Sequence, residues 1–402
     1  MRILHVTPSF YPAWSYGGMP RCAYELCRAL VRLGLAVTVW TTDAWEATRR
    51  LDKPGTVVDG ISVRRFPNLS NWLAYHRQLY LPRGLRPFAR RHVAEFDLVH
   101  LHSHRHLLQP LVCGPARRAG VPYVFTGNGT VPPIERYLAL KRGADLLGAR
   151  AILRRAQACI AVSEAERKHY LAAGVDAGRV AIIPNGVPLE QFSHLPAPGI
   201  FRRKHGLGSE PLVLFVGKIT PRKGVDVLLR AVALLPRDVR LVVAGNFMMP
   251  EQPVRLLARN LGISERVRFV GLLSGNDKLA AYVDADVVAY PSADEIFGLV
   301  PFESLICGTP PVVCDDSGCG EMVQAAGGGV LVPYGDPGAL ATALSALLGD
   351  PTWRAELVTR GQQYIREHLG WDRVAGQTLA LYRDVLAHRA RQAGGTQPWK
   401  ST

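Results

Sequence analysis

The sequence has no long hydrophobic run. Of its 402 residues, 48% are hydrophobic and 20% are charged, which is ordinary for a globular protein and excludes collagen, coiled-coil and disordered chains. The apolar stretches are interrupted well before the roughly 20 residues that a helix needs to cross a bilayer. Residues 1–6 enter a strand-like pattern at once, without the organisation of a signal peptide. We therefore expect a cytoplasmic protein with no membrane-spanning helix.

Cysteine is scarce and irregularly spaced. The seven cysteines are an odd number, and no paired C-x-x-C sets are present that could bind a metal. This pattern fits reduced thiols in a cytoplasm better than a disulfide scaffold. Cys314 and Cys319 could bind a ligand, but we interpret them as small buried residues.

Acidic residues are too few to balance the basic ones. Lysine and arginine number 48 and the acidic residues 33, which gives a formal net charge of +15. Nucleic acid, an anionic membrane and phosphorylated small molecules all attract such a chain. No recognised DNA- or RNA-binding module appears, and the basic residues are not interleaved with aromatic ones as a stacking platform for bases. We therefore predict no nucleic-acid partner.

Part of the basic excess lies in residues 64–118, which contain ten arginines and two acidic residues. The apolar residues there are Trp72, Leu73, Tyr75, Leu79, Tyr80, Leu81, Leu85 and Phe88, mixed with Arg77, Arg83, Arg86, Arg90 and Arg91. Such a mixture suits a segment that lies on an anionic membrane, with the protein peripheral on its inner face. The alternative is a solvated insert whose apolar side chains pack on a sheet.

The chain alternates short apolar strands with amphipathic helices, and it does so twice. We expect strands at residues 3–7, 37–42, 98–101, 121–125, 159–162 and 180–183, and then at 212–216, 240–244, 267–270, 287–290, 311–314 and 330–332. Apolar strands separated by helices indicate a parallel sheet that is covered on both faces. The predicted fold class is α/β, with two Rossmann-like domains that face one another across an interdomain cleft where ligands bind.

The length also favours two domains, because 402 residues exceed what one hydrophobic core usually supports. A stretch rich in proline, from residue 188 to residue 199, separates the two alternations. The predicted domains are an N-terminal domain at 1–190, a C-terminal domain at 191–372, a C-terminal helix at 373–392 that returns to the N-terminal domain, and a frayed tail at 393–402.

The most specific motif follows the strand expected at 287–290. The chain reads D-E-I-F-G-L-V-P-F-E from residue 294, and C-G-T-P comes soon after. Glu295 and Glu303 lie eight residues apart, one in a loop and one in the first turn of a helix. Gly298 permits close backbone approach, and the free amides at the helix start can hold a phosphate. The helical carboxylate could then reach ribose hydroxyls, and the loop carboxylate sugar hydroxyls; a capping glutamate with a solvated loop acid is the alternative.

This stretch closely resembles the E-x7-E signature of the retaining glycosyltransferases with the GT-B fold, specifically the large family-four group (glycosyl transferases group 1). The resemblance extends from the first strand to about residue 385. It implies an enzyme that moves a sugar from a nucleotide-diphosphate sugar to an acceptor hydroxyl and retains the anomeric configuration, in polysaccharide, glycolipid or other glycoconjugate biosynthesis. The acceptor would be a carbohydrate, a lipid-linked molecule or a small molecule.

A second motif, G-K-I-T-P-R-K-G from Gly217 onward, follows the strand at 212–216. It resembles the family pattern G-R-L-x-x-x-K-G, whose arginine and lysine hold the donor diphosphate. Lys223 matches the lysine. Lys218 replaces the arginine and lacks the planar group that binds two oxygens at once, which Arg222 could supply instead. A solvated basic turn is the alternative.

In the N-terminal domain, Gly17 and Gly18 end the loop after the first strand. This loop resembles the family's P-x-x-G-G loop, which approaches the donor phosphate and the acceptor, although the spacing from Pro12 is longer here. Trp14 and Tyr16 could stack on an acceptor, but aromatic residues in loops more often only pack.

Histidines alternate at positions 100, 102, 104 and 106. At period two, four imidazoles could point to one side of an extended segment and bind a metal, but no carboxylate or cysteine completes a ligand set nearby. The family usually has a histidine just past this strand, near the donor sugar, and His102 matches it best. His100 would lie at the strand end, and His104 on the acceptor side or the surface.

One position departs from the family pattern. After the strand at 121–125 the family often has T-x-H-G, whereas this chain has T-G-N-G. Asn128 could hydrogen-bond a hydroxyl on the acceptor side, but it cannot titrate, so an acid or base role at this position is in doubt. By analogy, the backbones at Gly245, Gly271 and Leu272 would border the nucleobase.

The resemblance implies a front-face substitution, in which the departing β-phosphate itself accepts the proton of the acceptor. Lys218 and Lys223 already neutralise the diphosphate, and no DxD-type metal motif occurs at a strand end of the N-terminal domain, so we predict that no metal or other cofactor is required. A sugar-nucleotide epimerase or a phosphorylase with a similar double-Rossmann cleft is the alternative.

The predicted site residues form three groups. The catalytic residues are Glu295, His102 and Lys223. The donor-binding residues are Gly17, Gly18, Gly217, Lys218, Arg222, Lys223, Gly271, Leu272, Phe297, Gly298, Leu299, Val300 and Glu303. The acceptor-side residues are Trp14, Tyr16, His104 and Asn128.

Overall fold

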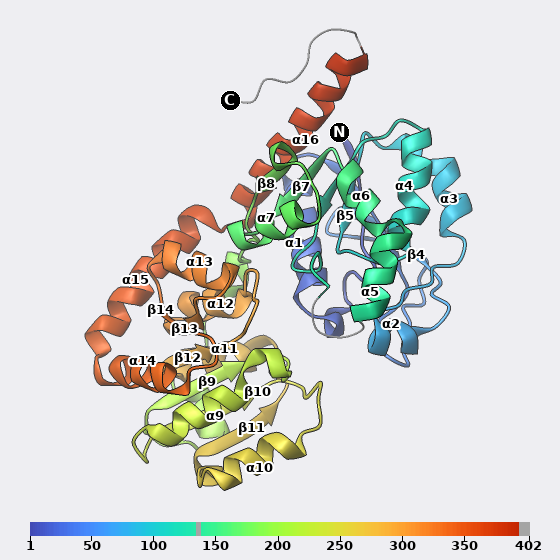
Figure 1. Ribbon diagram of the computed structural model, residues 1–402. Helices are drawn as coiled ribbons and strands as arrows, with labels where there is room; N and C mark the ends of the chain where they lie inside the picture. Colours follow the sequence, from blue (N-terminus) through green and yellow to red (C-terminus); the bar gives the residue numbers. More distant parts are fainter. Residues whose placement is uncertain (134–137, 394–402) are drawn as a thin grey trace. The chain divides into compact units, whose positions relative to one another are not determined.

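The computed structural model describes residues 1–133 and 138–393, and the chain divides into two compact α/β units (Figure 1). Unit 1 combines residues 1–186 with the C-terminal part of the chain from residue 371. Unit 2 comprises residues 187–370. Each unit has its own β-sheet and its own buried core.

The strands of unit 1 form one eight-stranded sheet in the order β3-β4-β2-β1-β5-β6-β7-β8. They are β1 (Arg2–Val6), β2 (Ala36–Thr42), β3 (Gly55–Val58), β4 (Ile61–Phe66), β5 (Leu98–His102), β6 (Tyr123–Thr126), β7 (Ala158–Ala161) and β8 (Val180–Ile182). The helices are α1 (Gly18–Arg32), α2 (Asn71–Arg77), α3 (Leu85–His92), α4 (Leu108–Arg118), α5 (Leu138–Ala144), α6 (Arg150–Arg155), α7 (Glu164–Ala172) and α16 (Trp371–Ala393).

The sheet of unit 1 is parallel except at one edge, where β3 runs antiparallel to β4. The sequence predicted a wholly parallel sheet and neither of these two strands. The reason lies in β4, where buried Ile61 and Val63 alternate with exposed Ser62 and Arg64, so the continuous apolar run of the other strands is missing. Such alternation is typical of a strand with one face covered and one face open to solvent.

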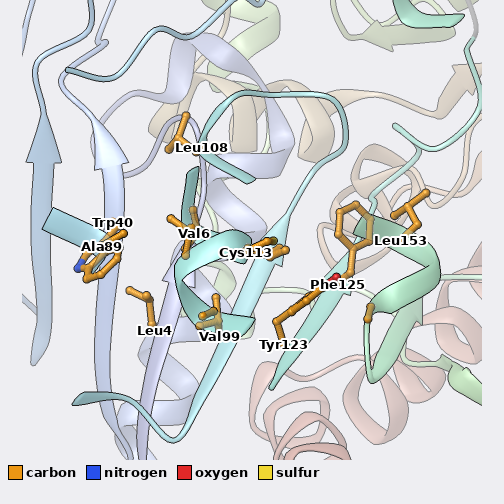
Figure 2. Packing of buried hydrophobic residues seen from close by; sticks show 14 of the residues in the cluster. Leu4, Val6, Trp40, Ala89, Val99, Leu108, Cys113, Tyr123, Phe125 and Leu153 are labelled. Carbon is orange, nitrogen blue, oxygen red and sulfur yellow. The ribbon is translucent and has the colours of Figure 1, made fainter. Parts of the chain in front are cut away.

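The core on one side of this sheet forms because the side chains that the central strands direct to that side are apolar. Leu4 and Val6 of β1 lie beside Val99 of β5, and Phe125 of β6 lies next to Leu153 of α6 (Figure 2). All of these side chains are buried. The core therefore fixes the central strands, and with them the positions of the loops that follow their carboxyl ends.

Unit 2 has a six-stranded, wholly parallel sheet in the order β11-β10-β9-β12-β13-β14. Its strands are β9 (Leu212–Val216), β10 (Arg240–Ala244), β11 (Val267–Gly271), β12 (Val287–Tyr290), β13 (Pro311–Cys314) and β14 (Val330–Val332). Its helices are α8 (Ile200–Lys204), α9 (Val225–Leu234), α10 (Gln252–Asn260), α11 (Gly275–Asp284), α12 (Leu299–Ile306), α13 (Gly318–Ala326), α14 (Pro337–Gly349) and α15 (Pro351–His368).

Both sheets have the strand order of a Rossmann-like fold, as predicted. In unit 2 the order reverses between β9 and β12, and in unit 1 it reverses between β1 and β5. At such a switch point the loops after the two strands diverge and leave a crevice at the carboxyl edge of the sheet, which is where ligands bind in open α/β sheets. The fold thus indicates one ligand-binding crevice in each unit, at the carboxyl edge of its sheet.

The C-terminal helix α16 belongs to unit 1 and packs on α1. At its start, an oxygen of Asp372 lies 2.6 Å from Nη2 of Arg32 in α1. Unit 2 is therefore an insertion between two parts of unit 1.

All seven cysteines are unpaired thiols and buried, Cys314 and Cys319 among them, as predicted. In residues 1–133 and 138–393, none of the helices combines the length and the apolar character that a membrane span requires.

Candidate functional site

The loops after β9 and β12 meet at the switch point of unit 2. The first contains Lys223 in a short 3-10 helix, and the second contains Glu295. Nζ of Lys223 pairs with Oε2 of Glu295 and donates to the hydroxyl oxygen of Tyr290 at 2.6 Å. The hydroxyls of Tyr290 and Ser292 each donate to Glu295 at 3.1 Å. The structure therefore brings together a lysine and a glutamate that lie 72 residues apart in the sequence.

Glu295 is ionised in this arrangement. Burial raises the pKa of its carboxyl, but the charges of Lys223 and Arg222 outweigh burial and leave that pKa below its ordinary value. A carboxylate in such a pair can exchange its cation for another positive centre. It is therefore suited to stabilise positive charge that develops on a substrate.

Arg222 holds the two loops together. Its Nη1 donates to the carbonyl oxygens of Ala293 at 3.3 Å and of Asp294 at 3.1 Å, while the N–H of Ala293 donates to the carbonyl of Arg222 at 2.9 Å. These bonds fix the loop that contains Glu295. The guanidinium is thus already bound to the main chain at the place where the sequence predicted a phosphate ligand.

Glu303 is buried in α12 and is bound on both oxygens. Nζ of Lys278 donates to each carboxylate oxygen at 2.9 Å, and the hydroxyl of Tyr282 donates to Oε2 at 2.9 Å. Lys278 and Tyr282 both come from α11. They neutralise and orient the carboxylate that the sequence assigned to the ribose.

The start of α12 depends on a glycine. Gly298 has φ 71°, in the left-handed region that favours glycine, and a Cβ there would lie 2.8 Å from Sγ of Cys319. The first amides of the helix, those of Leu299 and Val300, have no acceptor within the helix itself. Phe297 is buried and its ring packs 5.0 Å from that of Phe302, so this side chain supports the helix start from inside.

The remaining donor-side residues lie along the same edge of the sheet. Gly217 and Lys218 directly follow β9, and the side chain of Lys218 is exposed. The N–H of Gly245, after β10, donates to the carbonyl of Gly271 at the end of β11 at 2.7 Å, and Leu272 is exposed. Parallel strands place all these ends in one row.

In unit 1, three buried histidines meet at the switch point between β1 and β5. Nδ1 of His5 and Nε2 of His102 share a hydrogen bond of 2.9 Å, and the rings of His100 and His102 stack with centroids 4.2 Å apart. One nitrogen from each lies within 4.8 Å of the others, and within the described residues no other group of three His, Cys, Asp or Glu side chains could hold a metal ion in this way.

Hydrogen bonds to protein groups already occupy His100. Its Nδ1 lies 2.6 Å from the hydroxyl of Tyr382 in α16, and its Nε2 lies 2.7 Å from Oγ1 of Thr126 at the end of β6. A metal ion would have to displace one of these partners. The cluster is therefore a hydrogen-bonded network that links the C-terminal helix to two strand ends.

The histidines of the network are neutral at ordinary pH. Burial, with a smaller contribution from His106, lowers the pKa of His102 to about 3. Burial and the neighbouring imidazoles also lower the pKa values of His5 and His100 well below the ordinary value. At neutral pH His102 can thus form hydrogen bonds, but it does not act as a cationic acid.

Nδ1 of His102 is buried and, among the described residues, has no hydrogen-bond partner. His102 lines a small pocket of unit 1 together with Thr126, Asn128 and Asn185. The pocket has a volume of about 20 Å³, roughly the space of one water molecule. Asn128 has φ 49°, and its Oδ1 accepts a hydrogen bond from Nδ2 of Asn185 at 3.1 Å. The pocket thus offers polar groups for one hydroxyl.

The four alternating histidines do not share one face; a shared face was the alternative that the sequence analysis disfavoured. β5 ends at His102, and Ser103 and Arg105 adopt positive φ values of 62° and 64°, which turn the chain. Nε2 of His104 lies 3.3 Å from Oδ1 of Asp145, and Nε2 of His106 donates to the carbonyl of His102 at 2.7 Å. The third histidine of the cluster comes instead from β1.

The aromatic residues of the first loop pack within unit 1. The ring of Trp14 lies 5.6 Å from that of Tyr24, and the ring of Tyr16 lies 5.8 Å from that of Tyr75. Gly17, with φ 108°, ends the loop, and Gly18 begins α1. Both aromatic side chains are half-buried.

Comparison with known proteins decides the family. The family described as Glycosyltransferase Family 4 matches residues 16–191, and the family described as Glycosyl transferases group 1 matches residues 199–364. A D-inositol 3-phosphate glycosyltransferase of Nocardiopsis dassonvillei is 34% identical over 429 residues, which cover 96% of this chain and 94% of the relative. One of Salinispora tropica is 33% identical over 96% of this chain and 86% of the relative. The chain belongs to the group 1 glycosyltransferases.

Solved structures show the fold of this group 1 glycosyltransferase. Anabaena Alr3699/HepE, in complex with UDP and glucose, has a TM-score of 0.77 and 23% identity, covering 96% of this chain and all of that one. Sucrose-phosphate synthase of Thermosynechococcus elongatus has a TM-score of 0.78 and 24% identity, covering 96% and 99%. The GT-B fold predicted from the sequence is confirmed.

Sequence reasoning missed several polar residues of the glycosyltransferase that contact predicted ones or their neighbours, among them His5, Lys278, Tyr282 and Tyr382. All four of these lie on strands or helices that were interpreted only as packing elements. The signal that could have found Lys278 and Tyr282 is their spacing of four residues in the helix before β12, which places both on one helical face.

The basic region 64–118 of the glycosyltransferase is not a separate insert, because it includes β5 and three helices. Tyr80 and Leu85 are buried in the core of unit 1, and Phe88 packs against that core, whereas Trp72 and Leu79 are exposed. The four arginines of α3 and the turn before it, Arg83, Arg86, Arg90 and Arg91, are exposed.

Proposed function

We propose that this glycosyltransferase takes a sugar from a nucleoside diphosphate sugar and transfers it to an acceptor hydroxyl with retention of the anomeric configuration. The proposal rests on the ion pair between Lys223 and Glu295 at the switch point of unit 2, where a cation for phosphate and a carboxylate for sugar lie side by side. The similar Anabaena protein, crystallised with UDP and glucose and also with UDP-glucose, supports a nucleotide sugar as donor.

In this proposal unit 2 binds the donor. Lys218, Lys223 and the first amides of α12 bind the diphosphate, because a helix N-terminus and nearby cations favour an anion. Lys223 then exchanges its contact with Glu295 for a phosphate oxygen. Glu303, oriented by Lys278, accepts hydrogen bonds from the ribose hydroxyls.

Glu295, once released from Lys223, faces the donor sugar. Its carboxylate accepts hydrogen bonds from sugar hydroxyls and stabilises the positive charge that develops at the anomeric carbon as the bond to phosphate lengthens. This interaction strengthens in the transition state, so we assign Glu295 to kcat rather than to ground-state binding.

The transfer itself is a front-face substitution. The bond between the anomeric carbon and the β-phosphate oxygen breaks, and the acceptor oxygen forms its new bond on the same face of the sugar. The acceptor's proton passes to the departing phosphate oxygen, so the released nucleoside diphosphate takes it up. Lys218 and Lys223 neutralise that leaving group, and for this reason we propose that the reaction needs no metal ion.

Unit 1 binds the acceptor and the non-reacting part of the sugar. Nδ1 of His102 provides one hydrogen bond without transferring a proton, because the imidazole stays neutral. Asn128 lies in the same pocket and provides a polar group for a hydroxyl. The relatives are named D-inositol 3-phosphate glycosyltransferases, so a phosphorylated cyclic polyol is the first acceptor to test, beside carbohydrate and lipid-linked acceptors.

A thermal-shift panel of uridine- and guanosine-diphosphate sugars tests the donor. A ligand at 100 times its Kd stabilises the folded protein by about 2.7 kcal/mol, so the right donor raises the melting temperature above all others. Incubation with that donor and candidate acceptors, followed by NMR of the product, then gives the anomeric configuration. Inversion, or conversion of the donor in the absence of any acceptor, would contradict the proposal.

A further inference from the structure

The segment 138–155 of unit 1 exposes leucines at the kinked junction of two short helices. It consists of α5, a π-helical turn (Asp145–Ala149) and α6. Leu146 and Leu147 are 89% and 91% exposed, more than any other large hydrophobic side chain in the described residues, and Leu140 is 68% exposed. Leu138 is also exposed. Exposed single leucines are ordinary, but four within ten residues form a patch, which marks an interaction site.

Hydrogen bonds to Arg105 hold Asp145, the residue directly before the two leucines, in place. The carboxylate of Asp145 is buried and accepts two hydrogen bonds from Arg105, each of 2.8 Å, through Nε and Nη2. Arg105 also donates to the carbonyls of Thr130 and Val131 at 2.6 Å. Gly148, with φ 119°, kinks the segment just after the two leucines. The leucines therefore follow directly on a residue whose carboxylate is fixed.

The exposed charges of this segment are of one sign. The segment contains five basic residues, Lys141, Arg142, Arg150, Arg154 and Arg155, and its one acidic residue is the buried Asp145. Four of the five, all the arginines, are exposed. Within residues 138–155, exposed leucines lie beside exposed arginines and no exposed acid, which is complementary to a surface that is apolar inside and anionic outside.

We propose that the kinked leucine segment, residues 138–155, docks on an anionic lipid bilayer, with Leu146 and Leu147 inserted at the boundary between headgroups and acyl chains. The exposed arginines of the segment then contact lipid phosphates. The excess of positive charge beside the leucines favours an anionic bilayer over an apolar protein surface. The inference stands apart from the donor and acceptor residues proposed above and does not depend on them.

Flotation with vesicles of phosphatidylglycerol and phosphatidylcholine tests the docking. The wild-type chain floats with these vesicles at low salt, and Leu146→Glu/Leu147→Glu lowers its partition roughly tenfold or more. Val57→Glu in β3 is the matched control, because Val57 is 69% exposed in the same unit; it leaves the partition unchanged. Equal partition of the wild type and the double variant, or flotation of neither, overturns the proposal.

Insertion of the leucines into the bilayer can be measured separately. In Leu147→Trp, vesicles shift the tryptophan emission to shorter wavelength, and the shift is larger than in Val57→Trp. Both glutamate variants must melt at the wild-type temperature. Size-exclusion chromatography of the wild type and of the double variant without lipid tests the alternative that the leucines bind a second copy of the chain. A wild-type dimer that dissociates in the double variant would show this, and it would also overturn the proposal.

Discussion

The hydroxyl of Tyr382 lies 2.6 Å from Nδ1 of His100, although 282 residues separate the two in the sequence. Both are buried, and His100 is hydrogen-bonded on its other side to Thr126 and stacked on His102. The C-terminal helix thus fixes the imidazole against which His102 rests. Tyr382 and His100 act as positioning residues for His102.

We predict that Tyr382→Phe weakens both folding and turnover. Removal of the hydroxyl leaves a buried nitrogen of His100 without a partner, which costs about 1–3 kcal/mol in the free energy of unfolding. Because His102 loses its support, kcat falls several-fold while donor affinity stays the same. Urea unfolding and donor titration measure these effects, with Tyr334→Phe at an exposed position of unit 2 as control. A variant with wild-type stability would contradict the role of this hydrogen bond.

Glu303 and Glu295 should differ in the kinetic parameter that they affect. Glu303→Ala removes the acceptor of ribose hydroxyls and raises the donor Kd by roughly 100-fold, a loss of about 2.7 kcal/mol, so that binding disappears at donor concentrations near the wild-type Kd. Glu295→Gln leaves Kd nearly unchanged and lowers kcat by roughly 10²-fold or more. Calorimetric titration and initial rates separate the two. Asp294→Asn, an exposed carboxylate beside Glu295, should behave as wild type, and normal turnover by both glutamate variants would refute the site.

The protein should lose stability in mild acid. Burial lowers the pKa of His106 to about 4 and that of His102 to about 3, whereas unfolded histidine titrates near 6.5. Below about pH 6.5 the unfolded chain therefore binds more protons than the folded one, and the free energy of unfolding falls as the pH decreases toward about 4. Each such histidine contributes a slope of up to about 1.4 kcal/mol per pH unit.

His106→Gln tests this dependence. Glutamine can keep the hydrogen bond to the carbonyl of His102 but does not titrate, so the slope between pH 6.5 and 4 decreases by about one histidine's share, ~1.4 kcal/mol per pH unit. Urea unfolding at a series of pH values gives the slopes. The same slope in both proteins would mean that His106 is protonated equally in the folded and unfolded states.

Chelation should leave transfer unaffected. We expect the rate in excess EDTA to equal the rate with added Mg²⁺ or Mn²⁺, because Lys218 and Lys223 neutralise the diphosphate. Initial rates with the donor identified above measure this. Activity that disappears in chelator and returns with a divalent ion would count decisively against the proposal.

The arginines of α3 provide a second, separate test of membrane association. Since Arg83, Arg86, Arg90 and Arg91 are exposed, we predict that wild type pellets with anionic vesicles at low salt and that the fourfold change of these arginines to Glu does not. At about 1 kcal/mol per basic side chain near such a surface, four arginines make a measurable difference. Equal pelleting of both proteins would assign this face to another role.

The sequence predicted the strand, loop and helix around Glu295 and Glu303 because the signals for them are local. The strand β12, the loop with Glu295 and the helix with Glu303 occupy 20 consecutive residues, 287–306, and each piece has its own pattern. The meeting of Glu295 with Lys223 was also predictable, since β9 and β12 are both apolar parallel strands and their carboxyl ends share one edge.

The unit 1 network was not predictable in the same way. His5 lies in a strand that reads as core, and only the pairing of β1 with β5 places it opposite His100. Tyr382 lies in a helix at the far end of the chain. The turn at Ser103 and Arg105 could not be predicted either. Both residues have positive φ, which sequence patterns usually indicate through a glycine, and neither residue is a glycine. Such contacts depend on tertiary pairing, which no local pattern encodes.

Because unit 2 is inserted into unit 1, the two units can complete their folding only in a fixed order during synthesis. Unit 2 is continuous in the chain, so it can finish folding as soon as residue 370 leaves the ribosome, whereas unit 1 must wait for α16. At about 5–20 residues per second, the nascent chain spends roughly 10–40 s between residues 187 and 370 with the histidines of β1 and β5 already made and Tyr382 still untranslated. A chain stopped between β14 and α16 therefore contains the strands of both sheets but lacks the hydrogen bond that supports His102, and we expect it to be inactive.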